Sequence, residues 1–227
     1  MMGWYRRRWL DVVASIYIYN EHRGYTALDG LLGAIRTVMP HDQALIAEVE
    51  QHRADEYKHY LMFRRWFEKR GQMPLFVDRT CGHIDRFIEI MFGSRIDELL
   101  TTAVIGNERN FEKACRIVAL TERRGFRQVE ILLRHPVIRG ERQLTKIFEI
   151  IAEDEPGHWA PYEGWLKRHG RREPVWWERW IDGLIHSELL LMKLPVLFLT
   201  PHLQRRSTWP DESDAHRGHA GVATFAV

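Results

Sequence analysis

Two short stretches decide the fold of this chain: Glu56-Tyr57-Lys58-His59 and Glu155-Pro156-Gly157-His158. Each stretch follows one further glutamate, so the order Glu, then Glu-x-x-His, occurs twice. Residues i and i+3 of a helix share a face, and each Glu-x-x-His can therefore point both side chains at one place in a helical core. Four carboxylates and two imidazoles form the ligand set of a carboxylate-bridged dinuclear metal site.

The first of the two preceding glutamates is Glu21, near the middle of a helix that we expect over about residues 10–38. Apolar residues recur there at helical spacing, and Pro40 marks the end. Glu21 shares a stripe with Val13 and Tyr17, so its carboxylate belongs to the buried face. Glycines at 24, 30 and 33 weaken this helix, and we attribute them to close helix packing in preference to room for a substrate.

The first Glu-x-x-His lies on a second expected helix, over about residues 42–70. A basic last turn followed by Gly71 marks its end. Glu56 and His59 occupy positions of the inward stripe where leucine would be usual. A buried carboxylate without a partner costs several kcal/mol. A metal ion would supply that partner.

A crossover of residues 71–93, with a short helix over about 84–91, would return the chain to the starting end. We expect a third long helix from the cap-like sequence at 94–97 to Arg124, ended by Gly125, and a separate short helix over 129–134. The inward stripe of the third long helix places Glu108 centrally, which makes Glu108 the predicted fourth carboxylate of the site. Glu112, one turn later, is the alternative.

The second Glu-x-x-His lies on a fourth long helix, expected over about residues 141–169. Pro156 cannot donate a backbone hydrogen bond, crowds the carbonyl of Ala152 and disfavours helical geometry at Glu155. We therefore predict a kink or bulge at this half of the site. Such irregularities gather at functional positions.

The remaining features favour one domain over residues 1–200 with an added helix at about 174–194, followed by a disordered tail at 204–227. Lys and Arg number 33 and Asp and Glu 31, so the formal charge of +2 does not favour nucleic acid as a partner. Two cysteines do not suggest a disulfide framework, and no apolar stretch is free enough of charge to span a membrane. We expect a cytoplasmic protein, or one peripheral to a membrane, with a homodimer as one option.

Over about residues 10–170 the pattern and the helix layout resemble the ferritin-like superfamily of di-iron carboxylate proteins. The resemblance implies an all-α fold, a four-helix bundle with a long crossover between the second and third helices. It also implies that Glu56 and Glu155 bridge two iron ions. Glu21 and His59 would complete one iron, and Glu108 and His158 the other.

Mixed carboxylate and imidazole ligands suit iron or manganese, whereas structural zinc sites more often contain thiolates. The preferred function is an oxidoreductase of the monooxygenase or oxidase type. It would activate O2 to hydroxylate or oxidise a small or medium apolar substrate, with electrons from a donor protein or reductant. The alternatives are an iron-handling or peroxide-reducing protein of the ferritin or rubrerythrin kind, and a metal-free helical bundle.

Three further residues are candidates for holding the imidazoles in place by hydrogen bonds: Asp55, Asp154 and Asn107. His52, one turn before Glu56, is either an extra ligand or a hydrogen-bonded core histidine. The sequence favours the second reading.

Overall fold

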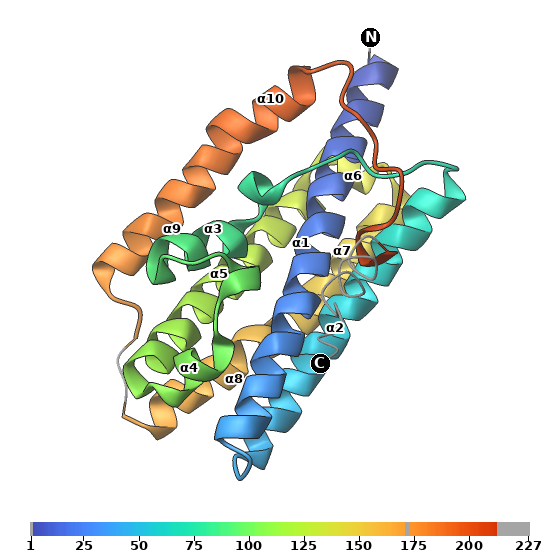
Figure 1. Ribbon diagram of the computed structural model, residues 1–227. Coiled ribbons are helices and arrows are strands. Elements are labelled where there is room, and N and C mark those ends of the chain that lie inside the picture. The colour runs from blue at the N-terminus through green and yellow to red at the C-terminus, as the bar shows by residue number, and fades with distance from the viewer. Residues whose placement is uncertain (1, 171–172, 213–227) are drawn as a thin grey trace, which may run out of the picture.

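The computed structural model describes residues 2–170 and 173–212, which are all-helical and contain no β-strand (Figure 1). The long helices are α1 (Met2–Val38), α2 (Gln43–Lys69), α5 (Glu108–Arg134), α7 (Arg142–Asp154), α8 (Pro156–Arg168) and α9 (Trp176–Glu188). The shorter ones are α3 (His83–Phe92), α4 (Thr101–Gly106), α6 (Pro136–Arg139) and α10 (Leu194–Leu199). Two 3-10 turns, Arg79–Cys81 and Ile96–Glu98, and a π-helical segment, Leu189–Lys193, complete the helical content.

Four long rods form the body of the molecule. α1 packs along α2, α5 packs along α7 and α8, and α2 closes the group by packing against α7 and α8 (Figure 1). α3 and α4 lie in the crossover and cover α1 and α5. The arrangement agrees with the expected helical bundle and its long connection between the second and third rods.

The ends of α2 follow from local chemistry. The Asp42 side chain accepts a hydrogen bond from the backbone N–H of Leu45, which satisfies one of the free donors at the helix start. At the other end Gly71 adopts a φ of 61°, a left-handed conformation that glycine tolerates best. Both bounds match the sequence prediction.

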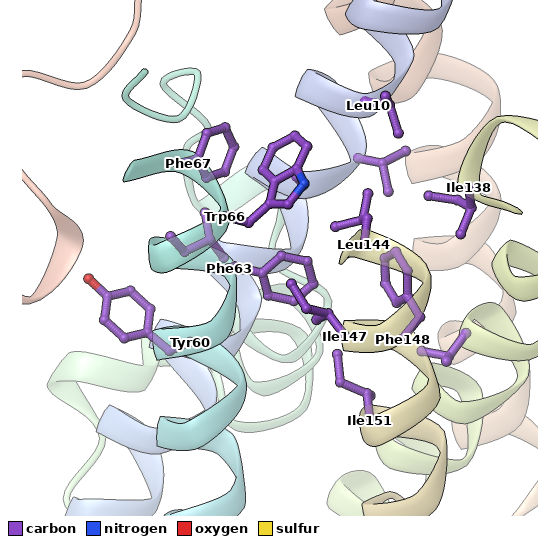
Figure 2. Packing of buried hydrophobic residues seen from close by; sticks show 14 of the residues in the cluster. Leu10, Tyr60, Phe63, Trp66, Phe67, Ile138, Leu144, Ile147, Phe148 and Ile151 are labelled. Carbon is purple, nitrogen blue, oxygen red and sulfur yellow. The ribbon is translucent and has the colours of Figure 1, made fainter. Parts of the chain in front are cut away.

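Apolar packing is concentrated on either side of a polar middle layer. One cluster joins Leu10 of α1 with Phe63 and Trp66 of α2 and Phe148 of α7 (Figure 2). A second cluster, at the other end of the rods, contains Leu28, Leu45, Phe111, Cys115 and Tyr162. Buried glutamates and histidines lie between these clusters.

The third rod differs from the prediction. The sequence 94–97 does not start a long helix: Ile96–Glu98 is a 3-10 turn, and α4 ends before Asn107, whose side chain caps α5. Gly125 does not end the rod either, and α5 continues through it to Arg134, so the expected short helix at 129–134 is part of α5. The physical reason is that Gly125 has helical geometry and lies against a neighbouring rod.

The fourth rod is interrupted where the sequence predicted it. α7 ends at Asp154 and α8 begins at Pro156, but Glu155 between them keeps helical backbone angles, φ −48° and ψ −41°, which Pro156 was expected to disfavour. Proline has no backbone N–H, and it fits the first position of a helix because an N–H there would have no partner within the helix. The break therefore follows from Pro156.

The added helix was expected over about residues 174–194. α9, the π-helical segment and α10 together extend it to Leu199, and the charged side of α9 faces the bundle. In α9, Glu178 is fully buried against Arg116, and Asp182 pairs with Arg124. Trp176 and Trp180 are 77% and 60% exposed. The charged side of α9 thus packs on the bundle together with Ile185, and several large apolar side chains face outward.

Part of the predicted disordered tail has a defined place. Arg205 pairs with Asp11, Trp209 is buried, and the Tyr60 hydroxyl donates to Asp211. These tertiary contacts order residues 204–212 despite their polar composition. Residues 213–227 lie outside the described part of the chain. Within the described ranges, no helix has the length and apolar character needed to cross a bilayer.

Candidate metal centre

Two groups of metal-ligating side chains meet in the polar middle layer of the bundle. In the first group, Glu21 of α1 lies beside Glu56 and His59 of α2, and His59 Nδ1 is 3.3 Å from Glu21 Oε2. All three residues are buried. Their ligand atoms lie within 4.8 Å of one another, as the coordination of a single ion requires.

The second group also contains Glu56, now with His52, Glu122 of α5 and His158 of α8. His158 Nδ1 is 3.3 Å from Glu56 Oε1, and His52 Nε2 is 3.6 Å from the same oxygen. Glu122 Oε1 is 3.8 Å from His52 Nε2. Glu56 is shared by both groups, which is the position of a bridging carboxylate.

Glu155 lies at the edge of the second group. Its Oε2 is 3.6 Å from His158 Nδ1 and has no hydrogen-bond partner, although it is buried. The structure thus brings together five of the six predicted ligands: Glu21, Glu56, His59, Glu155 and His158.

The structure does not bring Glu108 to the centre. Glu108 is the first residue of α5 and is exposed, because the rod begins about four turns later in the chain than the sequence suggested. Glu112 is not near the centre either, since Arg116 pairs with it. Glu122 occupies the predicted place of Glu108, and Asn107, proposed to hold an imidazole, instead caps α5.

Two signals in the sequence could have located Glu122. Glu21 and Glu56 are 35 positions apart, and Glu122 and Glu155 are 33 apart, whereas Glu108 and Glu155 are 47 apart. In addition, Glu21 and Glu122 are each followed by glycine three residues later, at Gly24 and Gly125. The repeat is thus Glu-x-x-Gly followed by Asp-Glu-x-x-His.

Each of these glycines makes room for the Glu-x-x-His of the neighbouring rod. A Cβ at Gly24 would overlap the carboxylate of Glu56, and a Cβ at Gly125 would lie 3.4 Å from Glu155 Oε1. Gly24 is therefore required for the position of Glu56. Gly24 thus packs closely against a predicted ligand, and it also lines the cavity described below, as Gly30 does.

Unpartnered atoms show that a cation fits this arrangement. The buried nitrogens His52 Nε2, His59 Nδ1 and His158 Nδ1 have no hydrogen-bond partner. Buried polar atoms are paired in nearly all cases, and leaving one unpaired costs about 1–3 kcal/mol. The same atoms lie within a few ångströms of carboxylate oxygens, so a divalent ion between them would satisfy nitrogens and carboxylates together.

The carboxylates themselves are crowded. Burial and the neighbouring Glu56 raise the pKa of Glu21 well above its usual range, and burial with Glu122 does the same for the pKa of Glu155. Burial and Glu56 raise the pKa of Glu122 to about 8. The site holds more acidic groups than can ionise together without a cation, which is characteristic of metal and catalytic sites.

The pKa values of Glu56 and His52 are shifted in the opposite direction, below their usual values. Burial alone would raise the pKa of Glu56, but the neighbouring imidazoles of His158 and His52 outweigh it and hold that pKa below its usual value. Burial and the neighbouring His158 lower the pKa of His52 to about 4. Glu56 is therefore ionised and His52 neutral at pH 7, the states in which both residues ligate metals.

The outer nitrogens of the two Glu-x-x-His imidazoles face aspartates that precede the glutamates. His59 Nε2 is 2.9 Å from Asp154 Oδ2, and His158 Nε2 is 4.0 Å from Asp55 Oδ2. Lys58 Nζ lies 2.7 Å from both Asp55 and Asp154. Asp154 thus hydrogen-bonds His59, as predicted for this residue, whereas Asp55 is too far from His158 for a hydrogen bond.

His52 is held by a different contact. Its Nδ1 is 3.1 Å from the hydroxyl of Tyr162, which leaves Nε2 directed at Glu56 and Glu122. The sequence favoured a hydrogen-bonded core histidine, and the structure gives His52 that hydrogen bond together with a place in the second group. Three histidines and four glutamates therefore line the centre.

A cavity of about 520 Å³ opens beside these residues, between α1 and α5 and under α3 and α4. Glu21, Glu56, Glu122 and Glu155 line it on one side, and most of its other walls are apolar. Its size is typical of sites for small organic ligands. A molecule bound there would lie next to the carboxylates.

The chain matches no protein-family model, and no significant similarity to curated proteins or solved structures is found.

Proposed function

We propose that this protein is a dinuclear metal protein of the ferritin-like bundle type that uses O2 to oxidise an apolar substrate. The observation that carries the proposal is Glu56, which is shared by two ligand groups whose buried histidine nitrogens are otherwise unpartnered. One metal would be held by Glu21, Glu56 and His59. The other would be held by Glu56, Glu122 and His158, with His52 and Glu155 as further ligands.

Iron is the preferred metal and manganese the second choice, because carboxylates and imidazoles without thiolates suit both ions. Bound iron in such a ligand set supplies redox chemistry with O2. Insertion of one oxygen atom into a C–H bond of the substrate releases the other as water. It consumes two electrons and two protons, and the electrons come from an external reductant.

The residues of the chain have their own part in this chemistry. The apolar walls of the cavity exclude water and place the substrate beside the carboxylates. Asp154 orients the imidazole of His59, and Lys58 joins Asp154 to Asp55.

Metal analysis after anaerobic loading with ferrous iron tests the proposal. We expect about two ions per chain, loss of both in Glu56→Ala, and loss of one in Glu122→Ala. Glu108→Ala is the matched control and should keep the wild-type content. Absence of iron in the wild-type protein would contradict the proposal, as would equal losses in the Glu122 and Glu108 variants.

Reaction of the loaded protein with O2 separates the enzymatic function from iron handling. A protein that oxidises substrate keeps about two irons per chain through many additions of iron and O2. Loading far beyond that value would favour the iron-handling alternative. The cavity beside the carboxylates supports the first outcome, since storage requires no site for an organic ligand.

A further inference from the structure

The cavity beside the carboxylates has two chemically different ends. α5 runs along its whole length, with Phe111, Ala114 and Val118 before Glu122 and Arg124 and Gln128 after it. Glu122 therefore marks the level of the metal centre between the two ends. What lines each end determines which molecule fits.

The end before Glu122 is apolar. Phe111, Ala114 and Val118 of α5 face Leu28 and Leu31 of α1 there, and Phe92 of α3 covers them. Asp97, the acidic residue at this end, is paired with Arg23 at 2.8 Å. This end suits a hydrocarbon chain or ring, and burial of each methylene contributes about 0.8 kcal/mol.

The end after Glu122 carries the polar side chains of His83, Arg124 and Gln128, which residues of α9 contact from behind the wall. His83 Nε2 is 3.2 Å from Asp182 Oδ1, and the same carboxylate pairs with Arg124. The Gln128 amide nitrogen is 2.9 Å from His186 Nδ1. Asp182 neutralises Arg124, so this end carries little net charge to attract an anion.

His83 leaves one acceptor available in this wall. Burial and the neighbouring Arg124 lower the pKa of His83 well below its usual value, so the ring is neutral at pH 7. Since the Asp182 carboxylate can only accept, Nε2 carries the hydrogen and Nδ1 is left as a bare acceptor. Nδ1 is buried and has no partner in the protein, and His83 lines the cavity.

We infer that the cavity binds an amphiphile with an uncharged hydrogen-donating head, such as a hydroxyl or amide group. The head donates to His83 Nδ1, and the apolar chain passes the carboxylates toward Phe111 and Val118. A carboxylate head is disfavoured because it would meet a bare acceptor and an already neutralised arginine. That this amphiphile is the molecule oxidised rests on the proposed function; the binding itself does not.

Titration of the metal-free protein with primary alcohols from hexanol to dodecanol tests the inference by calorimetry. We expect saturable binding that strengthens about fourfold per added methylene until the apolar end is filled. Decanoate should bind at least tenfold more weakly than decanol. Equal affinities for decanol and decanoate, or affinities independent of chain length, would overturn the inference without any variant having to fold.

Two variants locate the ends of the ligand. Val118→Trp fills the apolar end and should abolish decanol binding, whereas Ile131→Trp, on an exposed position of the same helix, should leave it unchanged. His83→Leu should weaken decanol about tenfold and remove the preference over decanoate. His202→Leu, at an exposed position outside the cavity, should change neither.

The outcome is separable from that of the proposed function. Decanol binding with the expected chain-length dependence, in a protein that takes up no iron, would support the cavity and refute the metal centre. Iron uptake of about two ions per chain without saturable alcohol binding would support the metal centre and refute the inference about the cavity. Similar effects of Val118→Trp and Ile131→Trp would place the alcohol elsewhere and refute the inference.

Discussion

The two halves of the proposed metal centre repeat one sequence plan but do not repeat its geometry. α1 and α2 supply Glu-x-x-Gly at 21–24 and Asp-Glu-x-x-His at 55–59, and α5 with α7 and α8 supplies the same pattern at 122–125 and 154–158. The first half is built on two continuous helices, whereas the second has a boundary between two helices at Glu155 and Pro156. We therefore expect the first half to be the more rigid part of the proposed centre.

Other contacts show the same asymmetry. A Cβ added at Gly24 would overlap the Glu56 carboxylate, whereas a Cβ added at Gly125 would lie at an ordinary contact distance from Glu155. The position four residues before the Glu-x-x-His is His52 in one half and Ile151 in the other. His59 has a close aspartate partner and His158 a distant one. Variants made in matched pairs can measure each difference.

The largest difference is expected for the paired glycines. Gly24→Ala would displace the shared carboxylate of Glu56 and should weaken binding of both metals by about a hundredfold or more, as removal of a ligand does. Gly125→Ala should stay within about threefold of wild type and stabilise α5 by about 0.5–1 kcal/mol. Competition with a chelator measures the first quantity and thermal unfolding the second. Equal effects of the two variants would refute the asymmetry.

The paired aspartates should give the next largest difference. Asp154→Asn removes the carboxylate 2.9 Å from His59 and should weaken metal binding about 10–100-fold. Asp55→Asn removes a carboxylate that is 4.0 Å from His158 and should weaken metal binding less than about fivefold. Metal titrations of both variants under the same conditions test the order. A larger loss for Asp55→Asn would show that the two imidazoles are held in the opposite way.

The pH dependence of the metal-free protein tests whether both halves carry an excess of carboxylates. A carboxyl group with a raised folded-state pKa is protonated in the folded protein when it is already ionised in the unfolded chain. Stability should therefore fall between pH 6.5 and 8, by at most about 1.4 kcal/mol per pH unit for each such group. Below pH 6.5 the lowered pKa of His52 acts in the opposite direction.

Variants assign the slope to its groups. Glu122→Gln should reduce the share of the second half, to which Glu155 also contributes, and Glu21→Gln should remove that of the first, as measured by urea unfolding at several pH values. Glu108→Gln is the control and should retain the wild-type slope. A wild-type stability that rises from pH 6.5 to 8 would contradict the raised pKa values.

The smallest effect is expected at Lys58, which joins the two halves at the surface. Lys58→Met removes both contacts to Asp55 and Asp154, but the lysine side chain is 43% exposed and its charge is screened by water. We expect a loss of less than about 1 kcal/mol in the free energy of unfolding and less than about threefold in metal affinity. Denaturant unfolding and metal titration measure these values. A tenfold loss of affinity would show that the lysine sets the orientation of both aspartates.

The sequence predicted those parts of the fold that depend on local chemistry. The bounds of α2 follow from Asp42 and Gly71, and the break at Glu155 follows from Pro156. The positions of Glu21, Glu56 and His59 on buried stripes follow from helical periodicity. None of these inferences required knowledge of the partner helix.

The remaining features depend on contacts between distant segments. Gly125 is an ordinary stop signal in a sequence, and only its contact with Glu155 shows why it is glycine inside a helix. The sequence therefore predicted a third rod from 94–97 to Arg124, which begins about four turns before α5 does. That shift placed Glu108 at the centre in place of Glu122. The order of residues 204–212 likewise comes from Asp11 and Tyr60, which are far away in the chain.

The inward-facing charges of α9 have a consequence for the heat capacity of unfolding. A helix that is attached through Glu178 and Asp182 as well as through Ile185 should expose proportionally less apolar surface on detachment than the bundle does on unfolding. We expect its release to have a smaller heat-capacity change and a stronger dependence on salt than unfolding of the core. Asp182 and His186 contact the polar side chains of the cavity from behind, so this salt dependence should reach the cavity from that side.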